Sequence, residues 1–211
     1  MANLWFVSDT HFRHANILTF KRSDGSFVRP GFVDCVDMDE TMIERWNSVV
    51  KPPDHVYHLG DVSMMRPRFV RNQLNRLNGH KRLIRGNHDI YKTKEYLEFF
   101  DEIYGMRVLD NIIFTHIPIH PASLGRFAAN VHGHTHANPD LDNHSRKKED
   151  GTITQVPYIN VSVEQINYTP VSLEWIKARI KTLQAASSNS ERLLPTCRFS
   201  EQALVPVLEA T

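Results

Sequence analysis

Twelve histidines lie in this chain of 211 residues, and most of them stand in short clusters beside Asp, Asn and Gly. Seven side chains in these clusters could bind metal ions through oxygen or nitrogen, and none of the seven is a thiolate. They are Asp9, His11, Asp61, Asn87, His116, His134 and His136. Carboxylates, an amide and imidazoles together suit Mn, Fe, Zn or Ni better than copper(I) or an iron–sulfur cluster. The clusters therefore predict a site for divalent transition metals.

Seven donors could serve two metal ions. Two dications about 3.5–4 Å apart repel each other strongly unless an anion lies between them, and an aspartate at a strand end, such as Asp61, can bridge them. Two Asp carboxylates against two dications leave a charge of about +2, which attracts phosphate and lowers the pKa of a bridging water. Attack of water on a phosphate ester is the chemistry that this predicts.

Short apolar segments precede the clusters and predict the strands that position them. The expected strands span residues 3–7, 55–59, 81–84, 103–109, 112–115, 130–132 and 158–163, and the expected helices span 39–50, 68–77, 92–100 and 171–186. Strands that alternate with helices predict a sheet flanked by helices. Ligands bind such sheets at the carboxyl ends of the strands. We therefore expect the clusters to converge at one sheet edge.

The composition is that of an ordinary globular protein, with 41% hydrophobic and 23% charged residues. It excludes wholesale disorder and collagen-like or mucin-like chains. The longest apolar run, residues 4–7, is far shorter than the ~20 residues of a membrane-spanning helix, and no basic region precedes it. We therefore expect neither a membrane segment nor a signal peptide, and a cytoplasmic protein.

The chain is expected to form one domain over residues 1–186. Residues 187–211 carry Ser, Pro and Glu with weak periodicity and predict a tail that is partly ordered or docked. Two distant cysteines predict neither a metal-binding pair nor a disulfide framework. A net charge of +1 gives no bulk attraction to nucleic acids or membranes.

The motifs resemble those of the calcineurin-like metallophosphoesterases, a family with the ordered series D-x-H, G-D, G-N-H-D/E, H and G-H-x-H. The series occurs here as Asp9-Thr10-His11, Gly60-Asp61, Gly86-Asn87-His88-Asp89, His116 and Gly133-His134-Thr135-His136. The resemblance covers about residues 4–165 and is strongest to a small stand-alone branch of bacteria and their phages. It implies an α/β fold, a β-sandwich of mixed sheets flanked by helices in four αββα layers.

The same resemblance implies a role for each cluster. One ion would have the ligands Asp9, His11 and His136, and the other would have Asn87, His116 and His134. Asp61 would bridge the ions together with a hydroxide, which would attack phosphorus in line with the leaving oxygen. His88 would protonate the leaving group or steady the phosphoryl oxygens.

The second motif departs from the family pattern. Many members continue it as G-D-x-x-D-R-G, and the second Asp orients the catalytic His. Here the run is Gly60-Asp61-Val62-Ser63-Met64-Met65-Arg66, which lacks that carboxylate. A structural, hydrogen-bonding role is therefore the alternative for His88. The departure also argues against the Ser/Thr protein-phosphatase branch.

Two further groups of residues could contact substrate. Arg13, His14 and Asn16 follow the first motif and could reach a phosphate or orient Asp9, or they could form a solvated turn. Seven Lys and Arg and no acidic residue lie between Asp61 and Asp89. They could guide a polyanion, although the low net charge favours a solvated basic surface.

The expected function is that of a metal-dependent phosphodiesterase. Its substrate would be a nucleotide, a cyclic nucleotide or a nucleic-acid end, and manganese is the metal expected to support activity in vitro. A phosphomonoesterase is the alternative within the enzyme class, because the two kinds of enzyme share the ligand set. A non-catalytic scaffold of the same fold is the alternative outside it. The sequence leaves the oligomeric state open.

Overall fold

The computed structural model describes residues 2–139, 141–147, 151 and 153–191. Its first sheet has five strands in the order β11-β1-β2-β3-β4. These strands are β1 (Leu4–Val7), β2 (His55–His58), β3 (His80–Ile84), β4 (Glu102–Tyr104) and β11 (Val171–Ser172). All neighbouring pairs are parallel except β1 and β11.

The second sheet has four strands in the order β10-β7-β6-β5. They are β5 (Arg107–Leu109), β6 (Ile112–Phe114), β7 (Ala129–His132) and β10 (Tyr158–Asn160). β5 and β6 form an antiparallel hairpin, and the other two pairs are parallel. Asp110 and Asn111 join the hairpin with φ angles of 47° and 64°, the left-handed backbone that a two-residue hairpin turn requires.

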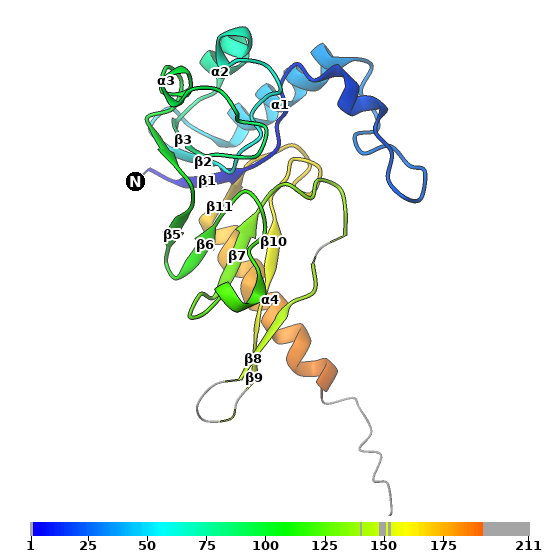
Figure 1. The fold of residues 1–211 in the computed structure, drawn as a ribbon, viewed down its shortest axis with the longest axis vertical. Coiled ribbons are helices and arrows are strands. Elements are labelled where there is room, and N and C mark those ends of the chain that lie inside the picture. Colours follow the sequence, from blue (N-terminus) through cyan, green and yellow to red (C-terminus); the bar gives the residue numbers. More distant parts are fainter. Residues whose placement is uncertain (1, 140, 148–150, 152, 192–211) are drawn as a thin grey trace, which may run out of the picture.

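Helices cover the two sheets on the outside, as Figure 1 shows. The α-helices are α1 (Cys35–Val49), α2 (Arg71–Arg76), α3 (Thr93–Tyr96) and α4 (Leu173–Glu191), and three short 3-10 helices are η1 (Ala15–Thr19), η2 (Pro67–Val70) and η3 (Pro121–Ser123). Helices α1 to α3 lie over the first sheet, while α4 runs along the second sheet and packs against β9 and β11. The mixed α/β architecture confirms the predicted fold class.

The apolar core lies between the sheets and beneath α1. Phe6 of β1 stacks on Phe114 of β6 with ring centroids 4.4 Å apart, so that these two rings join the two sheets. On α1, Trp46 is 2% exposed. α1 begins at Cys35 because the Asp34 side chain accepts hydrogen bonds from the amides of Val36 (2.8 Å) and Asp37 (2.9 Å), which caps the helix.

Some element boundaries differ from those expected. Residues 103–109 were expected as one strand, but they are divided between β4 and β5, which belong to different sheets. The helix expected over 92–100 is limited to α3, and that expected over 68–77 begins with the Pro67–Val70 3-10 turn. β8 (His144–Lys147) and β9 (Ile153–Val156) pair with each other as antiparallel strands.

The last helix is longer than expected. It continues to Glu191, so residues 187–191 of the segment expected as a partly ordered or docked tail are helical. Residues 192–211 of the expected tail lie outside the described part of the chain. Among the described residues, no helix combines the length and the apolar character that crossing a membrane demands.

Candidate metal centre

The predicted clusters meet at one end of the sandwich, but they come from both sheets. Residues 9–11 follow β1, Asp61 follows β2 and residues 87–88 follow β3, all in the first sheet. His116 and residues 134–136 follow β6 and β7 of the second sheet. The expectation of a single sheet edge was therefore wrong in detail, because chain reversal at residues 105–106 builds a second sheet whose strand ends face the same site.

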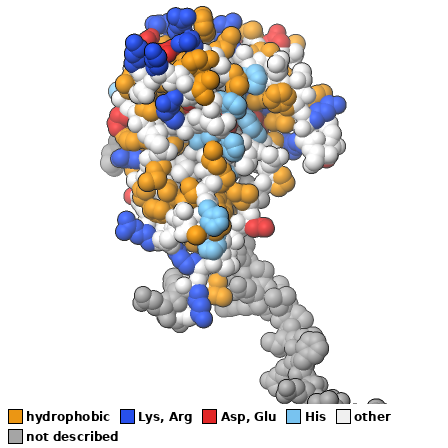
Figure 2. Space-filling model, viewed as in Figure 1, with side chains coloured by type: hydrophobic (Ala, Val, Ile, Leu, Met, Phe, Trp, Pro, Cys, Tyr) orange, Lys and Arg blue, Asp and Glu red, His pale blue; other side chains and the backbone are white. Residues whose placement is uncertain are grey.

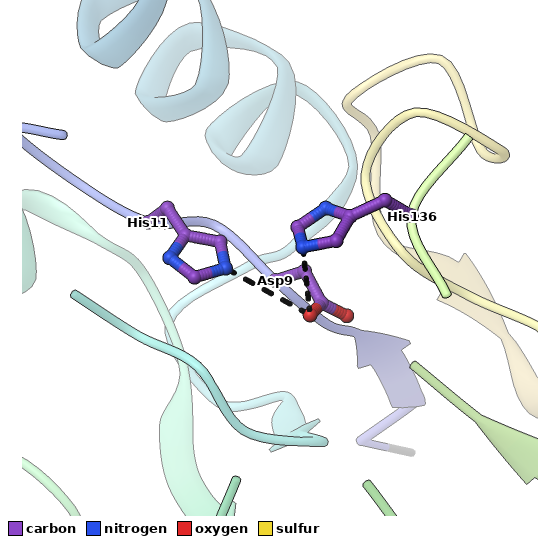
Figure 3. A group of neighbouring side chains, drawn as sticks. All are labelled: Asp9, His11 and His136. Atoms are coloured by element: carbon purple, nitrogen blue, oxygen red, sulfur yellow. Dashed lines mark ion pairs between the residues drawn. The ribbon is translucent and has the colours of Figure 1, made fainter. Parts of the chain in front are cut away.

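Asp9, His11 and His136 form the first group that could hold a metal ion. Figure 3 shows both imidazoles turned toward Asp9 Oδ1. The Nε2 atoms of His11 and His136 lie 3.9 and 3.8 Å from that oxygen. The other carboxylate oxygen, Oδ2, accepts hydrogen bonds from Ser162 Oγ and from the His134 amide, both at 2.9 Å. One oxygen of Asp9 is thus fixed by the protein and the other faces the two imidazoles.

Asp61, His116 and His134 form the second group. His116 Nε2 lies 3.3 Å from Asp61 Oδ2. Asn87 joins this group, since its Oδ1 lies 2.8 Å from His116 Nε2 and 2.9 Å from His134 Nδ1. The structure therefore brings together all seven side chains that the sequence singled out as candidate ligands.

Asp61 faces both groups. Its Oδ2 atom lies 3.7 Å from His11 Nε2 of the first group and 3.3 Å from His116 Nε2 of the second. Its Oδ1 atom accepts a hydrogen bond from the His88 amide at 2.8 Å. Burial raises the pKa of Asp61, but His116, the His88 amide and His11 together outweigh burial, and the pKa falls to about 2. An ionised carboxylate therefore lies between the two groups near neutral pH.

Hydrogen bonds at Nδ1 set the tautomers of two of these histidines. His136 Nδ1 lies 3.0 Å from Glu164 Oε1, and His116 Nδ1 lies 2.7 Å from the Leu59 carbonyl oxygen. An imidazole that donates from Nδ1 keeps a lone pair on Nε2, the atom that could bind a metal. Burial lowers the pKa of His136, but Glu164 and Asp9 together raise it, so that the net shift is upward.

Glu164 and Arg29 contact the first group on the side of the protein interior. Neither was predicted as a site residue. Arg29 is 1% exposed, donates to Glu164 Oε1 at 2.7 Å, and also donates to the backbone oxygens of Thr10 (2.9 Å) and Asp9. Arg29 stands in a polar segment with no motif around it, so no sequence signal marks it.

Most candidate ligands lie on strained backbone. Positive φ angles between 47° and 68° occur at Asp9, His11, Asp61, His134 and His136. Left-handed backbone is uncommon for residues other than Gly, and it clusters at functional sites where the surrounding structure enforces it. The surrounding structure therefore holds these residues in an unfavourable backbone conformation that turns their side chains toward one another.

The glycines of the motifs allow the close approach that the centre requires. A Cβ atom on Gly133 would lie 2.0 Å from Ser8 Oγ and 2.3 Å from Asp9 Oδ2, and one on Gly86 would lie 2.2 Å from Asp61 Oδ1. Gly60 has a φ of 96°, and its Cβ would lie 2.4 Å from the Gly86 amide nitrogen. No larger residue fits at these positions without displacing a candidate ligand.

We expect Gly133→Ala to weaken metal binding at the first group by at least about tenfold, because the added methyl group must displace the Asp9 carboxylate. Gly105→Ala is the matched control: its φ is not positive, and its Cβ would meet no atom within 4 Å. Titration of both purified variants with Mn²⁺ measures the effect. Equal affinity in the two variants would contradict the expected displacement of Asp9.

The donor set fits divalent transition metals. Asp9 Oδ1 and both ring nitrogens of His11 are buried and make no hydrogen bond within the described part of the chain. Buried polar atoms normally have partners, and a cation held by these atoms would supply one. The groups offer oxygen and nitrogen atoms only, which agrees with Mn, Fe, Zn or Ni.

His88 lies at the edge of the centre. Its side chain is 42% exposed, and its Nε2 lies 3.9 Å from Asp61 Oδ2. Asp89 does not orient it: the Asp89 carboxylate accepts hydrogen bonds from the amides of Asp61 (2.8 Å), Val62 (3.1 Å) and Gly86 (2.9 Å). Asp89 therefore fixes the turn that carries Asp61.

The three candidate substrate residues have different surroundings. The Arg13 guanidinium donates to the Phe69 carbonyl at 3.1 Å, so η2 holds it. The His14 ring lies 5.6 Å from the His11 ring and approaches the centre. Asn16 is exposed on η1. Of these three residues, His14 contacts a candidate ligand through its ring.

The basic segment between Asp61 and Asp89 is largely neutralised by acidic residues from elsewhere. Four of its arginines form ion pairs, which are Arg66–Glu95, Arg71–Glu98, Arg76–Glu40 and Arg82–Glu102. Arg85 donates to the backbone oxygens of Asp89 and Tyr91. The pairing favours the solvated basic surface over a guide for polyanions.

A sequence signature of the Calcineurin-like phosphoesterase superfamily domain matches residues 3–160, which include every candidate ligand. The chain belongs to this superfamily. The phosphoesterase signature ends at β10, so α4 lies beyond it. The family resemblance seen in the motifs is thereby confirmed.

Relatives of this phosphoesterase domain occur in an archaeon, in phages and among solved structures. The uncharacterized protein MJ1445 of Methanocaldococcus jannaschii is 37% identical over 187 residues, 83% of this chain and 90% of that protein. The Gene 66 protein of Mycobacterium phage L5 is 35% identical over 92 residues, 42% of this chain and 41% of that protein. A crystal structure of the Aquifex aeolicus protein of unknown function AQ665 has a TM-score of 0.60 and 27% identity, and covers 84% of this chain and 99% of that one.

Proposed function

We propose that this protein is a dinuclear metal-dependent phosphodiesterase. The position of Asp61 is the observation that supports this most directly, since one carboxylate oxygen faces an imidazole of each group. In the proposal, Asp9, His11 and His136 would hold one ion, Asn87, His116 and His134 would hold the other, and Asp61 would contribute to both sites. The ions, when bound, would supply Lewis acidity and a water of lowered pKa.

The side chains have separate tasks in this proposal. Glu164 and the Leu59 carbonyl keep His136 and His116 in the tautomer that presents Nε2. Ser162 holds Asp9 so that Oδ1 stays directed at the imidazoles. His88, exposed and next to Asp61, donates a proton to the departing oxygen at the solvent side.

Two cavities favour a diester over a monoester. A cavity of about 290 Å³ is lined in part by His136, and a second of about 460 Å³ is lined in part by Asn87 and His116. A phosphodiester has an ester arm on each side of phosphorus, whereas a monoester has one. A cavity beside each candidate metal group therefore supports the diester reading.

The test compares hydrolysis of p-nitrophenyl phosphate and bis(p-nitrophenyl) phosphate after chelation, with Mn²⁺, Ni²⁺, Zn²⁺, Fe²⁺ or Mg²⁺ added back. We expect turnover of the diester, stimulated by a transition metal and foremost by Mn²⁺. Turnover of the monoester alone would favour a phosphomonoesterase. A folded protein that binds two metal equivalents and hydrolyses neither ester, nor any nucleotide, would favour a scaffold. A cytoplasmic location stays a prediction.

A further inference from the structure

The smaller cavity lies against the first metal group. Its walls include Ile17, Phe20, Lys21, Arg22, Val28 and His136. Its volume of about 290 Å³ is near the lower end of the roughly 300–1,000 Å³ found for small-molecule sites. His136 belongs at once to this cavity and to the first group, so a ligand in the cavity would adjoin the metal centre.

A row of aromatic rings also connects this cavity to the centre. The Phe20 ring lies 5.7 Å from the His14 ring in an edge-to-face arrangement, and the His14 ring lies 5.6 Å from that of His11. Phe20 remains 48% exposed. Its ring is therefore available to a flat, apolar partner.

The loop over residues 20–28 forms one wall and is well anchored. The Val28 amide donates to the Phe20 carbonyl at 2.9 Å, and the Arg22 amide donates to the Ser26 carbonyl at 2.8 Å, so the loop closes on itself as a small hairpin. Arg29, immediately after it, is buried against Glu164 and the backbone of Asp9. Arg29 thus anchors both the loop and the first metal group.

Two cations line the cavity without a salt bridge to any described carboxylate: Lys21 and Arg22. Lys21 Nζ lies 5.2 Å from the centre of the Phe27 ring. Asp24, the nearby acid of the loop, accepts hydrogen bonds from the amide and hydroxyl of Ser26 and also interacts electrostatically with Arg22. In Figure 2, hydrophobic side chains lie between the pale-blue histidines and the Lys and Arg side chains on the lobe at the right.

We propose that this cavity binds one nucleoside arm of the substrate, with the base against Phe20 and a further phosphate near Lys21 and Arg22. An aromatic wall with two cations beside it matches a base that carries an anion, because bases stack on aromatic side chains irrespective of sequence. The larger cavity lacks this combination, since its Arg85 is engaged by the backbone at Asp89 and Tyr91. The inference rests on the proposed phosphodiesterase function.

The experiment uses three p-nitrophenyl diesters, namely methyl p-nitrophenyl phosphate, thymidine 5′-(p-nitrophenyl phosphate) and the same nucleoside ester with a 3′-phosphate. The wild-type chain should prefer the nucleoside ester to the methyl ester in kcat/KM, and the 3′-phosphate should add to the preference. Phe20→Ala should reduce the preference for the nucleoside by about tenfold. Lys21→Gln with Arg22→Gln should remove the gain from the 3′-phosphate.

Matched controls lie away from the cavity. Phe69→Ala removes a ring of similar exposure, 50% against 48%, and Lys181→Gln removes an exposed cation on α4. Both controls should keep the wild-type preferences. Equal kcat/KM for all three esters in the wild type, or preferences that survive Phe20→Ala, would overturn the nucleoside site while the phosphodiesterase stands.

Failure of the proposed function has a different signature, since no ester would then be hydrolysed in any metal. In that case, calorimetric titration with thymidine 3′,5′-bisphosphate tests whether the cavity binds a nucleoside. Binding by the wild type that Phe20→Ala weakens and Phe69→Ala does not would support the nucleoside site. Absence of binding by the wild type would overturn it.

Discussion

Asp61→Ala is expected to lower kcat/KM for hydrolysis of an aryl phosphodiester by at least about 10³-fold, or ~4 kcal/mol of transition-state stabilisation. The physical reason is that Asp61 Oδ2 faces His11 of one group and His116 of the other, so its loss leaves the charges of two dications without a bridging carboxylate. The measurement is steady-state kinetics in Mn²⁺, together with metal content after gel filtration. Metal content should fall at both groups.

His134→Ala should abolish hydrolysis to a similar extent with a narrower effect on metal binding. His134 belongs to the second group only, where its Nδ1 lies 2.9 Å from Asn87 Oδ1. The first group keeps its three side chains in this variant. We therefore expect one metal equivalent to be retained, in contrast to Asp61→Ala.

An ion pair at the far end of the first sheet provides matched controls. His80 begins β3, at the opposite end of that strand from Asn87, and His80 Nδ1 lies 3.4 Å from Asp101 Oδ2 with both side chains more than half exposed. His80→Ala and Asp101→Ala remove the same side-chain types and should leave kinetics and metal content unchanged. Wild-type-like rates in Asp61→Ala and His134→Ala would exclude the dinuclear mechanism.

The candidate ligands could be predicted from the sequence because each follows an apolar run that had to be a strand. A strand such as Leu4–Val7 has a fixed direction, so the polar residues after it must lie at its carboxyl end. Five strand ends carry the motifs in their family order, which leaves few possible arrangements for the side chains. The family signature and the geometry of the two groups agree with that reasoning.

Features that depend on tertiary contacts could not be predicted in this way. The division of residues 103–109 between two sheets rests on a chain reversal that local periodicity does not encode. The role of Asp89 depends on amides at Asp61 and Val62, more than twenty residues earlier in the chain. Arg29 is distant in sequence from Glu164. A charged residue in a polar segment is predicted to be exposed when its buried partner is not known.

Glu164→Ala is expected to destabilise the protein by roughly 3–5 kcal/mol, because it leaves Arg29 as a buried charge without a carboxylate. The side chains of Arg29 and Glu164 are 0% and 2% exposed, and their atoms are 2.7 Å apart. For a chain of this length the loss corresponds to a fall in Tm of roughly 6–20 °C. Thermal unfolding in the presence of a chelator measures it without any contribution from bound metal.

The same substitution should weaken metal binding at the first group by about 10–100-fold, since His136 loses the acceptor that orients its ring. Glu164→Gln separates the two effects. The amide oxygen can still accept from His136 Nδ1, so affinity should fall less, whereas the charge that balances Arg29 is gone and stability should fall as in the alanine variant.

An exposed ion pair tests whether burial of the Arg29–Glu164 pair is the cause of the expected loss of stability. Arg66 and Glu95 are 3.1 Å apart, close to the separation of the buried pair, but their side chains are 46% and 19% exposed. Glu95→Ala should therefore cost less than about 1 kcal/mol and leave metal affinity unchanged. If Glu164→Ala is no less stable than Glu95→Ala in chelator, Arg29 does not depend on Glu164 for its charge balance. If it is unstable but binds Mn²⁺ as the wild type does, Glu164 supports the fold and has no part in orienting His136.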